Sequence, residues 1–213
     1  MMRKVALLAV LGMAFVLVAG AADVPQAIAA ASQGLNSFRA TIHMVRYGKQ
    51  KAEIEFTFEF VPPVKMRIEY LAPANLKGQL VILNGDQLYT YLPALHRAVR
   101  KKVTPGSHHP GEEMGFLYQF VEGQAAAFLA GHLVTVEGPL PFTWPHGEES
   151  VSYQAYKLTL AGEEETQVVW CDADTFVPVG VDIYRGGELL IEVRVVKYEY
   201  NEELTPEDFA IPG

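Results

Sequence analysis

Apolar and polar residues alternate along much of the chain, which is the pattern of β-strands that have one dry and one wet face. In residues 53–60 the apolar side chains occupy every second position: Ile54, Phe56, Phe58 and Phe60. Residues 64–70 repeat this alternation after a turn at Pro62-Pro63. Two such runs joined by a short turn predict neighbouring strands of an antiparallel sheet whose polar face is in water.

Strand signals continue to the end of the chain. Asn84-Gly85 favours a tight hairpin between two short apolar runs, because both residues tolerate positive φ angles. The alternation in residues 188–200 changes phase near Val195-Val196, which indicates a β-bulge. We expect about eleven strands in all, and the remaining ones are a run that begins at Ala40 and residues 79–83, 87–92, 96–103, 133–137, 151–160, 166–172 and 177–184.

Two segments have the apolar spacing of amphipathic helices instead. Residues 23–38 carry one apolar stripe, and residues 114–130 carry a second one that ends before Gly131, a typical helix cap. The second stripe consists of Leu117, Phe120, Val121, Ala125 and Phe128. A sheet of about eleven strands must twist and curl, and its apolar concave face needs a cover. The sequence therefore predicts an α+β fold: a strongly curved open antiparallel sheet, or half-barrel, with helices over its concave face.

Pro and Gly mark two loops. Residues 104–113 (TPGSHHPGEE) and residues 138–149 are rich in both residue types, and the second stretch carries Phe142 and Trp144. Such composition is typical of segments that interrupt strands. We expect a loop at each place, the first of them between the sixth strand and the second helix.

Residues 1–21 have the features of a signal peptide. A short basic start precedes an apolar stretch at residues 5–19, which is too short to cross a bilayer comfortably. Residues 19–21 (Ala-Gly-Ala) then fit the small-x-small cleavage pattern. We expect cleavage near Ala22, export to the periplasm, and one soluble domain over residues 22–213. An uncleaved anchor helix is the alternative.

Charge and motif content argue against several functions. The net charge of −8 disfavours nucleic acid as a partner. Cys171 is the single cysteine, so no intramolecular disulfide can form, and we interpret it as a small buried apolar residue. No hydrolase, zinc-protease or phosphate-loop motif is present, so neither an enzyme nor a cofactor is predicted. A loop group was considered as a metal site and rejected, because adjacent histidines rarely converge on one ion: His108, His109, Glu112 and Glu113.

Four sequence blocks, in this order and spacing, resemble the LolA-like family of periplasmic lipoprotein carriers, LolB receptors and N-terminal domains of RseB-type sensors. They cover nearly the whole chain after residue 22. The blocks are residues 35–40 (LNSFRA), residues 63–70 (PVKMRIEY) with 80–91 (LVILNGDQLYTY), residues 174–179 (DTFVPV) with 198–201 (YEYN), and residues 204–209 (LTPEDF) with Pro212.

The resemblance implies a half-open barrel whose apolar interior, closed by helices, accommodates acyl chains. Carriers of this family place an Arg just before the Pro turn, where it is thought to latch the lid, but Val61 occupies the matching position here. Arg39, Arg46 and Arg67 are the candidates to replace it. On this basis the predicted lipid-binding residues are Phe56, Phe58, Phe60, Met66, Ile68, Leu117, Phe120, Val121 and Phe128. An ordinary packed core is the alternative interpretation of the same residues.

A second candidate site is a basic cluster on an otherwise acidic chain. Arg97, Arg100, Lys101 and Lys102, next to His96, fit either a docking site for lipid head groups or an acidic partner, or a solvated edge strand protected by charge. The predicted function is a monomeric periplasmic carrier or chaperone for lipids or lipoproteins, in contact with membrane-anchored donor or acceptor proteins. An RseB-like sensor that binds a membrane-anchored regulator is the alternative.

Overall fold

The structure is a computed structural model that describes residues 23–103 and 111–210. The expected signal peptide lies outside the described residues, as do His108, His109 and Pro212. Across the described part of the chain, each helix is too short or too polar to cross a bilayer.

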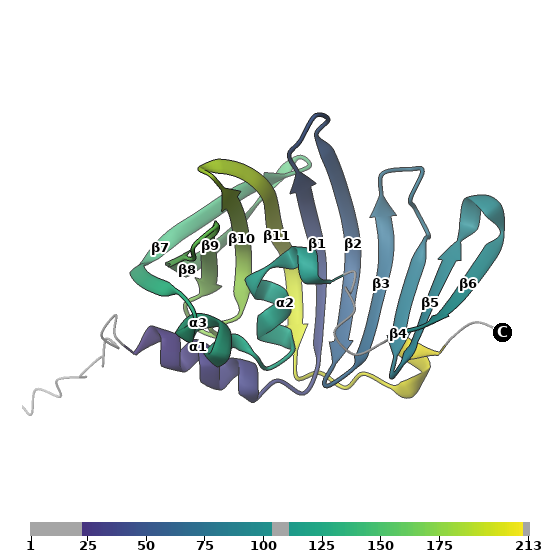
Figure 1. Ribbon diagram of the computed structural model, residues 1–213, viewed down its shortest axis with the longest axis horizontal. Helices are drawn as coiled ribbons and strands as arrows, with labels where there is room; N and C mark the ends of the chain where they lie inside the picture. Colours follow the sequence, from purple (N-terminus) through teal and green to yellow (C-terminus); the bar gives the residue numbers. More distant parts are fainter. Residues whose placement is uncertain (1–22, 104–110, 211–213) are drawn as a thin grey trace, which may run out of the picture.

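The eleven described strands form one antiparallel sheet in the order β6-β5-β4-β3-β2-β1-β11-β10-β9-β8-β7 (Figure 1). The first and last strands pair in the middle, and the sheet extends outward from them through neighbouring strands. Its edges, β6 and β7, remain apart in this order, so the sheet is open as predicted. The strands are β1 (Phe38–Arg46), β2 (Ala52–Val61), β3 (Lys65–Ala72), β4 (Leu80–Asn84), β5 (Gln87–Leu92), β6 (Arg97–Lys102), β7 (Leu133–His146), β8 (Glu149–Ala161), β9 (Glu165–Asp172), β10 (Pro178–Arg185) and β11 (Glu188–Tyr200).

Burial within the sheet follows the alternation in the sequence. Phe56, Phe58 and Phe60 of β2 are at most 3% exposed. Phe60 pairs with Phe38 of β1 on one side and with Met66 of β3 on the other, which continues the apolar face across three strands. Apolar burial on this one face supplies the main stabilisation of the sheet.

The predicted β-bulge is confirmed. Thr41 of β1 pairs with Lys197 and Ile42 pairs with Val195, which leaves Val196 as the extra residue of β11. A bulge shifts the side-chain alternation by one residue, so the two halves of this long strand can both present apolar side chains to the core.

The first helix is shorter than predicted. α1 (Val24–Gln33) ends at Gly34, whose N–H bonds to Ala30 O, and the chain then enters β1 at Phe38. The apolar stripe predicted over residues 23–38 therefore belongs to two elements, α1 and the first residue of β1. Phe38 is fully buried in the sheet, so its apolar character did not show that the helix had already ended.

The prediction of one helix over residues 114–130 is wrong. The segment contains the 3₁₀ turn η2 (Glu112–Met114), α2 (Phe116–Val121) and α3 (Ala125–Ala130). Gly115 and Gly123 have φ angles of 57° and 76°, and this left-handed conformation interrupts a right-handed helix. At Gly115 a Cβ atom would lie 2.7 Å from Gln167 Oε1, so a close approach to β9 requires glycine there.

The prediction of a loop at residues 138–149 is also wrong. β7 continues to His146 and β8 begins at Glu149, with a pairing irregularity between Glu137 and Leu140. Pro lacks an N–H donor and is excluded from central strands, but β7 is an edge strand and tolerates it. Composition alone could not distinguish an edge strand from a loop.

Two short turns complete the described elements. η1 (Pro93–Leu95) joins β5 to β6, and η3 (Pro206–Phe209) is a single turn near the end of the chain. Phe209 is 1% exposed, so η3 is anchored on the sheet by a buried ring.

Candidate functional site

The helices lie together over one face of the sheet, with α2 in front of β11 and β1 and with α1 and α3 side by side near one end (Figure 1). We call α2, α3 and the preceding η2 turn the lid. Aromatic rings connect the lid with the sheet: Phe60 lies 6.3 Å from Tyr118 of α2 and 6.1 Å from Phe58, measured between ring centroids. The concave face and the lid thus share one aromatic layer.

Eight of the nine predicted lipid-binding residues are packed in this layer. Each is at most 3% exposed, and they are Phe56, Phe58, Phe60, Met66, Ile68, Leu117, Phe120 and Val121. The ninth, Phe128 of α3, is partly buried and packs against Phe116 and His132. The structure brings the set together, in a closed arrangement in which side chains fill the space between sheet and lid.

A cavity of about 410 Å³ lies beside the lid. Phe128 and Tyr118 of the lid line the cavity on one side. Ile183 of β10, Ile191 of β11 and several carboxylates, including that of Glu122, complete the lining. Its volume is within the usual range of small-molecule sites, and its lining combines apolar side chains with charged and amide side chains. Phe128 is the one residue of the predicted lipid-binding set that lines it.

The lid is also held by polar contacts, which the sequence did not indicate. Gln167 Oε1 of β9 accepts a hydrogen bond from Phe116 N at 2.9 Å, and Ser32 Oγ of α1 donates one to Phe120 O at 2.7 Å. Both bonds are buried. The lid is therefore held by more than apolar contact, and opening it would expose or break two buried hydrogen bonds.

Of the three arginines considered as a latch, only Arg46 contacts the lid. It is the last residue of β1, and its guanidinium forms an ion pair with Glu113 of η2. Arg39 and Arg67 instead bind Glu59 on the convex face, at 2.8 Å and 3.5 Å. Arg46 therefore takes the position of a latch between the sheet rim and the lid.

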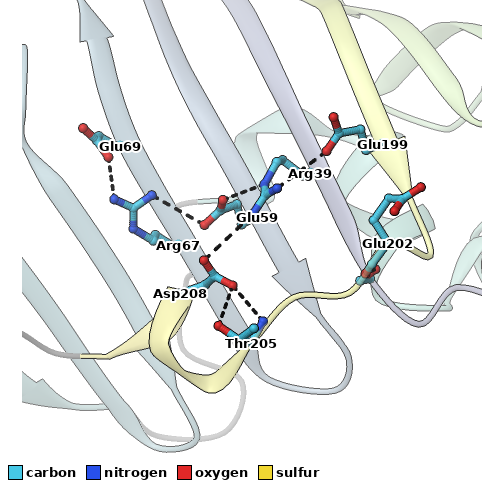
Figure 2. Close-up of polar contacts among 9 residues, drawn as sticks. Arg39, Glu59, Arg67, Glu69, Glu199, Glu202, Thr205 and Asp208 are labelled. Carbon is cyan, nitrogen blue, oxygen red and sulfur yellow. Dashed lines mark hydrogen bonds and ion pairs between the residues drawn. The ribbon is translucent and has the colours of Figure 1, made fainter.

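Glu59 is the centre of the convex-face network that Figure 2 shows. Its side chain is only 9% exposed, and the two arginines compensate its buried charge. Arg39 also lies 3.9 Å from Asp208 of η3, and Asp208 Oδ2 accepts hydrogen bonds from the backbone N–H (2.7 Å) and hydroxyl (3.0 Å) of Thr205. The bond from the Thr205 backbone lowers the pKa of Asp208. The network thereby fastens the end of the chain to the sheet.

The basic cluster lies on β6, an edge strand whose residues are all exposed. Alternation places Arg97 and Lys101 on one face of this strand and Arg100 and Lys102 on the other. Lys102 Nζ lies 3.2 Å from Asp86, and the Arg100 guanidinium lies 5.9 Å from the Tyr89 ring centroid. The edge location fits the strand-protection interpretation. The docking interpretation stays a prediction.

Cys171 of β9 is fully buried, as predicted. Burial raises the pKa of its thiol, so the side chain stays protonated and unreactive near neutral pH.

Neither a protein-family model nor a curated protein sequence matches the chain. Solved structures do match it. An uncharacterized conserved protein from Thermus thermophilus superposes with a TM-score of 0.53 at 14% identity, over 90% of this chain and 94% of that one. A chain of the Pseudomonas aeruginosa MucA/MucB complex gives 0.52 at 14% identity, over 90% of this chain and 61% of that one. A LolA superfamily protein from Nitrosomonas europaea gives 0.38 at 15% identity, over 90% and 97%.

The chain has the LolA-like fold that the sequence resemblance implied. At identities this low, the likeness establishes the fold alone. This chain spans about 61% of the length of the matched chain in the MucA/MucB complex.

Proposed function

We propose that the protein is an exported carrier or chaperone that holds acyl chains of lipids or lipoproteins between the concave face and the lid. The observation that carries the proposal is the shared aromatic layer of β2 and α2, in which the side chains that meet are large and apolar. Such a layer can part to admit an acyl chain of similar polarity. Residues 1–21, interpreted as a signal peptide, support a periplasmic location.

The proposed binding set is the predicted one, with two functional parts. Phe128, at the cavity of about 410 Å³, is the entry point, because it is already accessible. The eight buried residues become the wall of the acyl site when the lid moves. The cost of that motion is the loss of two buried hydrogen bonds and of apolar contact, which the bound chain restores in part. No catalytic step is part of this proposal.

The second candidate function is a sensor that binds a membrane-anchored regulator. The observation in its favour is the TM-score of 0.52 with a chain of the MucA/MucB complex. A carrier releases its cargo to an acceptor, whereas a sensor forms a stable complex with its regulator. Co-purification from native membranes distinguishes the two, since a stoichiometric membrane protein favours the sensor and co-purifying lipid or lipoprotein favours the carrier.

The decisive experiment measures binding of a fluorescent fatty acid to the purified protein and to two matched variants. Phe120→Asp places a carboxylate in the lid, and Phe142→Asp places the same group on the opposite face of the sheet. We expect the wild type to bind the probe, Phe120→Asp to stay folded with its lid displaced and bind poorly, and Phe142→Asp to bind normally for each folded molecule.

Circular dichroism and thermal melting report the folded fraction of each variant. If Phe120→Asp unfolds the domain, the lid is a fixed part of the core. A wild type that binds no fatty acid and carries no lipid by mass spectrometry would overturn the carrier function.

A further inference from the structure

The hairpin of β7 and β8 extends beyond the rest of the sheet. β8 pairs with β9 only from Ala155 to Ala161, whereas its pairing with β7 continues to the hairpin end at His146 and Glu149. We call this extension, residues 140–154, the arm. Figure 1 shows β7 running behind β10 and β11 toward β1, on the side opposite the helices.

Aromatic side chains fix the arm on the convex face. Phe142 stacks on Trp170 of β9 at 4.5 Å between ring centroids, and the Arg194 guanidinium of β11 lies 5.5 Å from the Phe142 ring. Trp144 is 7% exposed and stacks with His43 of β1 at 6.3 Å. These contacts hold the arm across the convex face from β9 to β1. Side-chain packing, and not strand pairing with the rest of the sheet, therefore positions the tip of the arm.

The tip of the arm brings His146 to two side chains from the centre of the sheet. His43 of β1 and Glu55 of β2 are directly paired in the register, so their side chains project side by side from the convex face. One ligand atom from each of His43, Glu55 and His146 lies within 4.8 Å of the other two. Both histidine rings also pack on Trp144, which limits their rotation.

Two imidazoles and one carboxylate are a donor set for a borderline divalent cation such as Zn²⁺, whereas Mg²⁺ and Ca²⁺ favour oxygen alone. Among the described residues, none of the three side chains forms a hydrogen bond or ion pair, so their ligand atoms are available. Tetrahedral Zn²⁺ with bonds of about 2.0–2.1 Å needs ligand atoms about 3.4 Å apart. The ligand atoms lie within 4.8 Å of one another, so ion binding requires them to move closer together.

We propose that His43, Glu55 and His146 bind one divalent cation of the Zn²⁺ class, with water in the remaining position, and that the ion fastens the arm to β1 and β2. Two ligands come from the paired strands β1 and β2 and the third comes from β7, far along the chain, so the complete site exists only in the folded protein. Binding therefore stabilises the fold and the position of the arm. The site is on the face opposite the lid and does not depend on the proposed lipid function.

The test titrates untagged protein with ZnCl₂ by isothermal calorimetry and records the thermal midpoint at each Zn²⁺ concentration. The background is the double variant His108→Ala/His109→Ala, so that the titration reports on the remaining histidines alone. In this background we expect one ion for each chain and a rise of the thermal midpoint with Zn²⁺. Glu55→Gln and His146→Asn should each weaken binding by at least about tenfold, the scale seen for altered metal sites. His96→Asn, on the distant β5–β6 connection, should leave binding unchanged.

A second measurement needs no ligand substitution. In NMR spectra of the same protein, the imidazole signals of two histidines should shift on Zn²⁺ addition, and they should be assigned to His43 and His146. Absence of binding in the background protein, or binding that Glu55→Gln and His146→Asn leave unchanged, would overturn the proposal. A shift confined to His96 or His132 would overturn it as well.

Discussion

Arg46 and Glu113 form an ion pair that joins the rim of the sheet to the first turn of the lid. Arg46 ends β1, and Glu113 lies in η2, just before the left-handed Gly115. Both side chains are partly exposed, at 45% and 40%, so water and salt can compete with the pair. Such a contact joins the lid to the sheet without carrying much of the folding energy.

Removal of this pair should loosen the lid while the fold stays stable. Exposed ion pairs contribute about 0.2–1 kcal/mol, so Arg46→Gln and Glu113→Gln should change the free energy of unfolding by no more than that. Hydrogen exchange of α2 amides should become faster, and a fluorescent fatty acid should associate faster. Glu137→Gln removes a partly exposed pair with Lys157 on the β7–β8 hairpin and serves as the control. Equal exchange rates in the Arg46 variant and this control would contradict the latch.

Gln167 should make a larger contribution than the ion pair. Its side chain is 4% exposed and supplies the acceptor for Phe116 N at the start of α2. Gln167→Leu leaves that N–H buried without a partner, which costs about 1–3 kcal/mol. We expect a lower urea midpoint and loss of exchange protection at the Phe116 amide. Unchanged protection of that amide would mean that the bond does not hold the lid.

The sequence was sufficient for most of the sheet because each strand with one wet face shows its own alternation. β2 and the bulge at Val196 could be recognised from local pattern alone. The break between α2 and α3 could not, because an apolar stripe continues across Gly123 whether or not the helix does. The one local signal was Gly123, because glycine tolerates the left-handed conformation that permits a break without requiring it.

The candidate sites likewise include one that the sequence could predict and one that it could not. The residues of the proposed lipid-binding set could be selected from the strand and helix stripes, since each stripe must face the core. The group of His43, Glu55 and His146 could not be found, because its third member is placed by the packing of Trp144 on the convex face. Such packing depends on how far the β7–β8 hairpin bends back over the sheet. Periodicity along the chain carries no information about that bend.

Asp208 should hold the C-terminal turn on the sheet. Its carboxylate accepts two bonds from Thr205 and lies 3.9 Å from Arg39. Asp208→Asn removes the charge and keeps the size, so the 3₁₀ turn η3 should exchange its amides faster while the rest of the sheet is unaffected. Glu207→Gln, in the same turn, is the control because it has no such role in the network that Figure 2 draws. Equal exchange in the two variants would contradict the capping role.

The same carboxylate gives a prediction for acidic pH. The pKa of Asp208 is lowered in the folded protein, so its contribution to stability is present above the ordinary pKa of an aspartate and is lost as the pH falls below it. Protection of η3 should decrease on acidification in the wild type. The Asp208→Asn variant should lack this part of the pH dependence, and a variant that keeps it would assign the effect to other groups.

Alkaline pH should destabilise the protein through Cys171. Burial raises the pKa of this thiol above its ordinary value of 9.0, so the folded state keeps its proton while the unfolded chain loses it. The free energy of unfolding is therefore unaffected below pH 9 and falls above it, by up to about 1.4 kcal/mol for each pH unit. Burial also raises the pKa of several tyrosines, among them Tyr118, Tyr153 and Tyr198, whose unfolded forms ionise near pH 10, so the contribution of the thiol is isolated by comparison with Cys171→Ala. Urea midpoints measured with reductant between pH 8 and pH 10 should fall for the wild type.

The urea midpoint of Cys171→Ala should be lower than that of the wild type at every pH, because a buried sulfur is lost. It should not change with pH until the tyrosines titrate. Parallel curves for the two proteins would show that the thiol is not the group responsible.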